Sequence, residues 1–553
     1  MFHDGNPVTA ADVAFTLDIV KNNHPFGAPM FGPVERVETP DAHTAILRLS
    51  QPHPALMAAL SPALLPILPK HVYGEGPIQT NPANLAPIGS GPFKFVEYRP
   101  GEHVVLERND RFFLEGRPHL DKLVFKIIKD PMATLLAVEH GEVRYLPFAN
   151  IRVRDLSRVK DNPALSFTQR GYEAFGTTNY LEFNLRKPPL DDVRVRKAIA
   201  HAIDKGFIVD KLISGQTVRL DGPMAQASPF RSDDLVRYPL HLDTANRLLD
   251  EAGHKRQADG TRFSLTLDWI PDANINSQEP TAQYLKSQLK KIGIDIVLRA
   301  SPDLPTWASR VSNWEHELTM NGIWNYPDPV IGTHRAFLST NQKKGVIWSN
   351  TEGYSNPHVD ELLAAAGREP DLAKRKAIYA KFQKIVTDDL PFAWTNEEPL
   401  FTIYDRKLDG IPLSVWGALA RSTRCSGRAE LIDRGSGRVR RGLAGPGSHP
   451  IGPRLPSPAS LLSAPLPRCG RGAVSRASRS PSPALRERGD PAPRGWGMRA
   501  LFSMGYRFRV HRWRNECGRG VIRPGGSRAF RPNSPAASLR GLVRDAGNGI
   551  IRH

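Results

Sequence analysis

Cysteine is absent from the first 420 residues of this 553-residue chain; its three cysteines, Cys425, Cys469 and Cys517, all come later. The first part therefore has no disulfide framework, which is compatible with either side of a bacterial inner membrane. It is long enough to bury more than one hydrophobic core, so we expect at least two lobes.

Long apolar runs are also missing. No stretch of about 18 apolar residues occurs, so the sequence predicts no membrane-spanning helix. Met1 is followed at once by Phe2, His3, Asp4 and Gly5, without the basic and apolar regions of a signal peptide. We expect the chain as written to carry no export signal.

Lysine is missing from one region, residues 421–553. This tail holds 27 Arg, no Lys and 6 acidic residues, whereas the first 420 residues hold 48 basic and 50 acidic residues. The net charge of +19 therefore comes from the tail. Arg, Pro, Ser and Gly dominate there, and such a composition does not supply a packed core. We expect residues 421–553 to be disordered or frameshifted.

Two hypotheses account for the tail. An Arg-rich segment can bind nucleic acid through phosphate contacts and stacking, which makes a nucleic-acid-binding protein the alternative function. However, natural basic arms usually mix Lys with Arg. Arg, Pro, Gly and Ala have GC-rich codons and Lys has A-rich ones, so a GC-rich stretch translated in the wrong frame would give this bias. We favour the second hypothesis and expect no nucleic-acid partner.

Hydrophobic patterning predicts an α/β fold. Thr9 and Asp12 form a capping box before a helix whose apolar face holds Val13, Leu17 and Val20. Alternating apolar residues predict strands around 93–95, 104–106 and 123–127. Helix pairs are expected over 192–214 and 359–386, with breaks near 204–206 and 370–371.

The middle of the chain contains a crossover unit. Residues 263–269 alternate as a strand, a helix follows from Pro280 until Gly293, and residues 294–298 alternate again. Strand, helix and strand in this order place the two strands parallel in one sheet.

Motifs for catalysis are incomplete. His316-Glu317 begins like a zinc-protease helix, but Met320 stands where the second histidine is needed. Gly89-Ser90-Gly91 lacks the Lys-Ser/Thr of a phosphate loop, and we interpret it as a turn. His3-Asp4 is interpreted as part of a turn before Pro7. We therefore predict no enzyme, no catalytic residue, no metal and no cofactor.

Residues 321–329 are the best candidate for binding. We expect a loop that interleaves Trp324 and Tyr326 with Asn325 and Asp328. An aromatic platform beside an amide and a carboxylate suits an amphipathic solute. The alternative is an ordinary Pro-kinked loop with a half-buried tryptophan.

Five blocks of sequence occur in an order typical of one family. They are Phe2-His3-Asp4-Gly5 with 7–13, Gly89-Ser90-Gly91-Pro92-Phe93 running to Asn109, Phe183-Asn184 with 189–204, the 324–329 loop, and Gly353-Tyr354-Ser355-Asn356-Pro357 closing at Asp389-Leu390-Pro391. On these blocks the chain resembles the extracellular solute-binding proteins of family 5, the peptide/nickel-type receptors of ABC importers. The resemblance spans residues 2 to about 416.

The resemblance implies a fold like the type II periplasmic binding proteins, with two lobes joined by a hinge. It implies an inserted small domain (1–87), parts of a first lobe (88–175 and 399–420) and a second lobe (176–398). It also implies a monomeric periplasmic receptor that presents a peptide or other small solute to permease subunits. Cleft residues would be Trp324, Asn325, Tyr326 and Asp328, with Asn184 near the hinge and Trp269, which also fits a strand core.

The chain departs from the family at three places. Family members begin with a signal peptide and a further segment, so we expect the first lobe to be incomplete. Peptide receptors of the family tend to carry Asp where this chain has Asn325, and the Asp carboxylate pairs with the ammonium group of the peptide. Asn325 offers that group only a neutral amide, so the pairing would need Asp328 in its place. Residues 421–427 can be encoded by codons that, when the reading frame is moved by two bases, encode Ile-Asp-Glu-Val-Leu-Trp. This string is similar to the end of family members. We therefore hypothesise a frameshift near that residue.

Overall fold

The structure is a computed structural model that describes residues 1–271, 278–419 and 424–427. The frameshift near residue 420 and nearly all of the predicted tail, 421–553, lie outside the described residues. None of the described helices is both long and apolar enough to cross a membrane.

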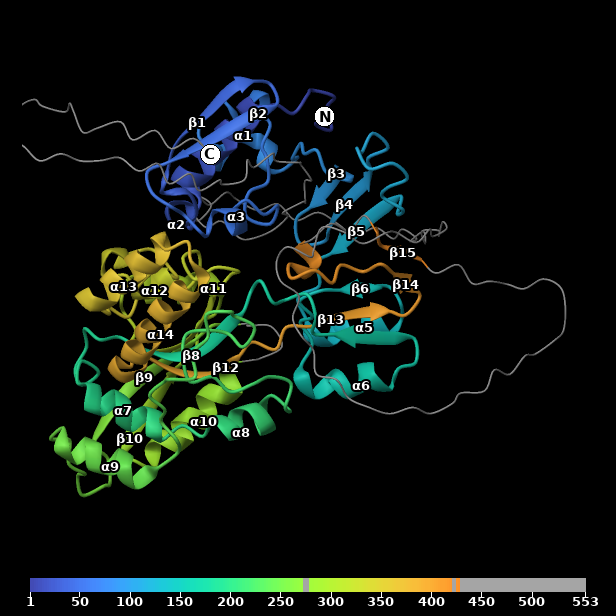
Figure 1. The fold of residues 1–553 in the computed structure, drawn as a ribbon. Helices are drawn as coiled ribbons and strands as arrows, with labels where there is room; N and C mark the ends of the chain where they lie inside the picture. Colours follow the sequence, from blue (N-terminus) through green and yellow to red (C-terminus); the bar gives the residue numbers. More distant parts are fainter. Residues whose placement is uncertain (272–277, 420–423, 428–553) are drawn as a thin grey trace, which may run out of the picture.

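The N-terminal part combines short helices with one hairpin, shown in dark blue in Figure 1. Asp12 accepts a hydrogen bond from the backbone N–H of Thr9 at 2.8 Å, which confirms the predicted capping box. Val13 and Leu17 are buried in the core of this part. Its elements are α1 (Ala10–Asn23), α2 (Gly27–Phe31), β1 (Val34–Asp41), β2 (Thr44–Leu49), α3 (Leu56–Ala59) and α4 (Lys70–Tyr73).

Two small sheets follow. The first is the antiparallel meander β3 (Phe93–Arg99), β4 (His103–Arg108) and β5 (Lys122–Lys126), at the three places where alternation predicted strands. The second orders its strands β6-β13-β7, so β13 (Thr402–Asp405) lies between β6 (Tyr145–Leu146) and β7 (Leu165–Thr168). The two sheets, with α5 (Pro131–Glu139) and α6 (Leu156–Asp161), are together called the first lobe below.

A five-stranded sheet with the order β10-β9-β11-β8-β12 forms the centre of the second lobe. Strands β9 and β10 are parallel and joined through α10, which confirms the predicted crossover unit. The strands are β8 (Thr177–Phe183), β9 (Phe263–Trp269), β10 (Ile294–Arg299), β11 (Leu318–Trp324) and β12 (Phe392–Glu397).

Helices cover this sheet (Figure 1). Both predicted helix pairs are present and break where expected, because Asp204 and Asp371 each cap the following helix with a side-chain oxygen. The helices are α7 (Val193–His201), α8 (Lys205–Phe207) continuing as a short π-helix (Ile208–Leu212), α9 (Leu242–Glu251), α10 (Gln278–Lys290), α11 (Leu304–Ser312), α12 (His334–Phe337), α13 (Pro357–Arg368) and α14 (Leu372–Asp389).

Part of one predicted loop is a strand. Residues 321–324 end β11 and pair with 177–180 of β8. The polar Asn321 is tolerated in this buried strand because its amide donates to the Glu182 carboxylate at 2.8 Å. The loop begins only at Asn325, so the prediction of a loop over the whole of 321–329 was wrong at its beginning.

The chain crosses twice between the two lobes. The first crossing, residues 169–176, leads from β7 to β8, and the second, residues 398–401, leads from β12 to β13. The N–H of Glu398 donates to the carbonyl of Thr177 at 3.0 Å, so the second crossing begins beside the point where the first crossing enters β8. Any site between the lobes has to form around this pair of segments.

Candidate functional site

A cavity of about 310 Å³ lies beside the two crossings. Three stretches converge on it: the first crossing with Thr177, the loop 215–227 of the second lobe, and the second crossing with Glu397. We call it the crossing cavity. Its volume is at the low end of the range of about 300–1,000 Å³ that is usual for small-molecule sites.

Backbone geometry brings these stretches together. Gly176 has a positive φ of 48°, and a Cβ added there would lie 2.9 Å from the Cβ of Ala225. A side chain at position 176 would therefore push the 215–227 loop away from the first crossing. On the opposite wall, Glu397 pairs with Thr178 in the antiparallel ladder of β12 and β8.

The lining of the crossing cavity is acidic. It includes Glu173, Glu397 and Glu398, and no Lys, Arg or His is found among the described residues that line it. Glu398 accepts a hydrogen bond from the Asn179 amide at 2.6 Å, and Glu173 accepts one from the Gly171 N–H at 3.0 Å.

Glu397 is the carboxylate of this lining that contacts the 215–227 loop. Its Oε1 atom accepts a hydrogen bond from the backbone N–H of Gln226, which ties the end of β12 to the 215–227 loop. Burial raises the pKa of Glu397, and this hydrogen bond and the nearby Arg231 charge offset the rise in part. The ionised form of this carboxylate is thus less favourable than that of an exposed glutamate.

A cluster of aromatic rings lies next to the crossing cavity. Tyr172, which lines the cavity, contacts Phe148 at 5.0 Å between ring centroids, and Phe148 contacts Phe175 at 5.2 Å. Phe175 meets Trp324 edge-on at 4.9 Å and Trp416 at 5.8 Å. Trp324 and Trp416 are only partly buried, so both rings retain exposed surface at the boundary between the lobes.

The predicted residues Trp324, Asn325 and Tyr326 lie at this boundary. Tyr326 is buried against Phe26 of the N-terminal part, and burial raises its pKa to about 12. Its N–H donates to the carbonyl of Phe175 at 3.3 Å, which fixes the loop to the first crossing.

Asn325 is buried and uses its amide inside the protein. Its oxygen accepts from the Ala225 N–H at 2.6 Å, and its nitrogen donates to the Pro223 carbonyl at 2.9 Å and to the Thr333 hydroxyl at 3.2 Å. Asn325 therefore holds the 215–227 loop against the first crossing, behind the wall of the cavity.

Asp328 is engaged in a buried ion pair. Its two carboxylate oxygens accept from the two terminal nitrogens of Arg375 at 2.8 and 2.9 Å, and only 8% and 5% of the two side chains are exposed. This bidentate pair joins the loop to α14. The charge of Asp328 is thus already matched by an internal partner.

Asn184 and Trp269 lie away from this group. Asn184 follows β8 at the end opposite to Thr177, where its buried amide donates to the carbonyls of Trp314 and His316 at 3.0 and 2.8 Å. Trp269 ends β9, is 8% exposed and belongs to the core of the second lobe. The structure brings three of the six predicted residues, Trp324, Asn325 and Tyr326, to the boundary. Asp328 is paired internally with Arg375, and Asn184 and Trp269 lie in the interior.

Sequence reasoning missed the acidic residues where β12 ends and the second crossing begins. Residues 395–398 form a polar run, Thr-Asn-Glu-Glu, that directly follows the buried apolar residues of β12. An acidic pair at the end of a buried strand is a signal that could have directed attention to Glu397 and Glu398.

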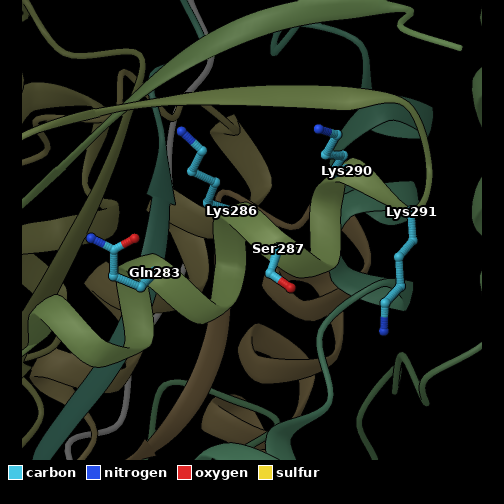
Figure 2. Close-up of a pocket in the computed structure, with 5 residues that line it drawn as sticks. All are labelled: Gln283, Lys286, Ser287, Lys290 and Lys291. Atoms are coloured by element: carbon cyan, nitrogen blue, oxygen red, sulfur yellow. The ribbon is translucent and has the colours of Figure 1, made fainter.

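A second hollow lies on the surface of α10 and is shown in Figure 2. It has a volume of about 480 Å³, but its lining residues come from the exposed face of one helix, Gln283, Lys286, Ser287 and Lys290, and from Lys291 directly after that helix. Figure 2 shows the ends of these side chains pointing apart rather than toward a common centre. The crossing cavity is therefore the better candidate for holding a solute.

Comparison with known proteins identifies the family. The model of the bacterial extracellular solute-binding proteins, family 5 (middle), matches residues 1–344. The oligopeptide-binding protein AppA of Bacillus subtilis is 27% identical over 430 residues, covering 71% of this chain and 73% of AppA. A peptide-binding protein of an ABC transporter from Brucella ovis is 29% identical over 403 residues, covering 71% and 73% of the two chains.

Solved structures show the same fold. NikZ of Campylobacter jejuni, in complex with Ni(L-His), superposes with a TM-score of 0.67 at 26% identity, covering 75% of this chain and 83% of NikZ. The structure of AppA in complex with a nonapeptide gives a TM-score of 0.65 at 25% identity, covering 77% and 84%. The fold is thus the two-lobe α/β fold of the type II periplasmic binding proteins, and the chain belongs to the bacterial extracellular solute-binding proteins of family 5, the receptors of ABC importers.

Proposed function

We propose that this chain captures an oligopeptide or a similarly sized solute between its two lobes, in the periplasm, and presents it to the membrane subunits of an ABC importer. The observation that carries this proposal is the crossing cavity, because both crossings and a loop of the second lobe line it. A solute held there touches the segments that connect the lobes, so its binding favours one arrangement of the lobes over others.

The aromatic cluster supports the proposal. Trp324 and Trp416 offer partly exposed rings at the boundary, and Tyr172 extends the same cluster to the wall of the cavity. Aromatic faces provide apolar contact area that tolerates different side chains, and polar groups beside them orient the solute. Trp324 is therefore the first ligand contact that we propose, with Asn325 and Tyr326 positioning the cavity wall.

The proposed division of the chain follows the two crossings. Residues 1–87 would form most of the inserted small domain, 88–175 and 399–420 parts of the first lobe, and 176–398 the second lobe. In this division Asp328 and Asn184 stabilise the second lobe rather than touch solute, because their polar atoms are bonded internally.

Equilibrium binding tests the proposal. The full chain would be screened by thermal shift, and hits measured by calorimetry, with three solutes suggested by relatives. They are a nonapeptide, as in the AppA complex; Ni(L-His), as in the NikZ complex; and glutathione, after the glutathione-binding protein GsiB of Pectobacterium atrosepticum. We expect saturable binding of at least one solute. An absence of binding by all three and by a mixed tripeptide library would contradict the proposal.

A further inference from the structure

The N-terminal part packs directly against the second lobe. Val330 and Ile331, from the loop after β11, are buried in the hydrophobic core of the N-terminal part. Phe26, the residue before α2, meets Tyr326 edge-on at 5.5 Å between ring centroids, and the guanidinium carbon of Arg335 lies 4.0 Å from the centroid of its ring. We call Phe26, Tyr326 and Arg335 the Phe26 contact. It joins the N-terminal part to two residues of the second lobe.

Arg335 brings a positive charge to this contact without a carboxylate partner. Only 6% of the residue is exposed, and it forms no ion pair with a described residue. Its Nε donates to the carbonyl of Gly332 at 3.0 Å, whereas Nη1 has no hydrogen-bond partner among the described residues. Burial lowers the pKa of Arg335 to about 10. The face of the Phe26 ring therefore partly compensates this charge, and a second positive charge nearby would meet repulsion.

His24 holds Phe26 in place. Its Nδ1 atom accepts a hydrogen bond from the backbone N–H of Phe26 at 3.0 Å, and the two rings meet edge-on at 5.2 Å. A ring nitrogen that accepts a hydrogen bond carries no proton, so the neutral imidazole has its proton on Nε2. A second proton has to bind Nδ1, where it removes the hydrogen bond from Phe26. It also adds a positive charge near Arg335.

We propose that the contact between the N-terminal part and the second lobe is acid-sensitive: protonation of His24 at Nδ1 releases Phe26 and separates the two parts while each remains folded. The proton acts in two ways, because it removes the acceptor that orients Phe26 and places a second charge beside the unpaired guanidinium of Arg335. The inference concerns the arrangement of the parts and does not depend on which solute the protein binds.

The direction of the pH dependence follows from the surroundings of His24. Burial and the Arg335 charge lower its pKa to about 4, from an ordinary value of 6.5 that an exposed His24 regains after separation. The separated form therefore binds a proton that the closed form does not between these two pH values. As pH falls through this interval, the ratio of separated to closed protein rises by about tenfold per pH unit. Above it, the contact is stable.

Other charged and titratable groups at this contact do not offset the new charge. The carboxylate of Asp328 is already bound by Arg375 at 2.8 and 2.9 Å. Burial also lowers the pKa of His53 and of His334, so neither supplies a negative charge. The complete set is His24 and His53 from the N-terminal part, and Tyr180, Tyr326, Asp328, His334, Arg335, Arg375 and Tyr379 from the second lobe.

Hydrogen–deuterium exchange on the full chain without solute, at pH 7 and pH 5 and corrected for the intrinsic exchange rates, tests the inference. We expect residues 24–31 and 326–337 to open about 10- to 30-fold more often at pH 5. Strands β9 and β10 of the second lobe should show no such increase. His24→Asn should abolish the response, since an Asn oxygen can accept from the N–H two residues on but takes up no proton.

Three further variants make the test specific. His43→Asn, at an exposed histidine of the β1–β2 turn, is the matched control and should respond to acid as the wild type does. His53→Gln keeps a donor for the Met30 carbonyl, which His53 contacts at 2.8 Å, and should also respond. Arg335→Met removes the repelling charge and should reduce the response several-fold. Circular dichroism at both pH values checks that each variant is folded.

An acid response at both stretches that is lost in His24→Asn and kept in His43→Asn supports the inference. Equal opening of the wild type at pH 7 and pH 5 would overturn it, as would an undiminished response in His24→Asn or an equal increase in β9 and β10. If His24→Asn does not fold, Arg335→Met decides, because a response as large as that of the wild type would overturn the inference and a smaller one supports it.

Discussion

Two carboxylates near the boundary between the lobes differ in their surroundings. Asp328, in the loop after β11, has both oxygens bound by Arg375, and Oδ1 also accepts from the Val330 N–H at 3.1 Å. Glu397, at the end of β12, accepts one backbone N–H and faces a cavity without a described basic residue. A fully bonded carboxylate holds the protein together, whereas one with unused capacity beside a cavity is available to a solute.

Breaking the internal pair should have the largest effect. Arg375→Met leaves Asp328 buried and unpaired, so we expect a loss of about 3–5 kcal/mol in the free energy of unfolding. Urea denaturation at pH 7 measures this loss. Lys374→Met, at the exposed neighbouring position, is the matched control and should change stability by less than about 0.5 kcal/mol. Similar losses in both variants would show that the pair has no structural role.

A third carboxylate, Glu352, extends the comparison to the interior of the second lobe. Burial and the nearby Glu182 charge raise its pKa well above the ordinary value. Because the folded state keeps this proton where the unfolded state loses it, the wild type loses about 1.4 kcal/mol of stability per pH unit between the two pKa values as pH rises. Glu352→Gln lacks this dependence, so its thermal stability relative to the wild type should increase from pH 5 to pH 8.

Thermal unfolding of both proteins across this pH range measures the difference. Glu361→Gln, in which an exposed carboxylate of α13 is replaced, is the control and should show no such trend. A constant difference between wild type and Glu352→Gln would mean that Glu352 titrates as it does in the unfolded chain.

The aromatic cluster should contribute less to stability than to binding. Trp324→Ala removes a partly exposed ring, and we expect the affinity for solute to fall about 10-fold, or about 1.4 kcal/mol. Calorimetry with the best solute of the screen measures this change. Trp348→Ala removes another partly buried tryptophan and should leave the affinity unchanged. An unchanged affinity in Trp324→Ala would exclude this ring from the solute contacts.

The pH dependence of binding is the smallest effect expected. Since burial raises the pKa of Glu397, this carboxylate takes up a proton at a higher pH than an exposed glutamate does. Binding of a solute that donates hydrogen bonds to this carboxylate should therefore weaken as pH falls from 7 to 5, and less so in Glu397→Gln. The charged groups around it are Glu173 and Glu398 in the cavity lining and Arg231 nearby. A parallel loss of affinity in both proteins would assign the effect to another group.

Local patterns predicted the framework well. The sequence predicted β9, α10 and β10 and the parallel arrangement of the two strands. These predictions came from the alternation of apolar residues in 263–269 and 294–298 and from the helical pattern after Pro280, each of which is contained in one short segment. The polar end of β11 was misjudged, since the partner that makes Asn321 acceptable in a strand, Glu182, lies 139 residues away in the sequence.

The crossing cavity could not be predicted in the same way. Its wall combines residues near 172, 225 and 397, and only the order of strands in the sheet brings these stretches together. The same limit applies to Asp328: the sequence shows a free carboxylate beside two aromatic residues, but its partner Arg375 lies 47 residues further on. Chemistry that depends on pairing between distant segments becomes visible only in the folded chain.

Hydrogen–deuterium exchange on the full chain, with and without the tightest-binding solute of the screen, tests the central claim most directly. The account predicts that bound solute slows exchange in three stretches, 172–177, 225–227 and 397–400, while the surface of α10 around 283–291 is unchanged. Protection confined to α10, or none at the crossings despite binding measured by calorimetry, would contradict the claim that solute is held where the two lobes meet.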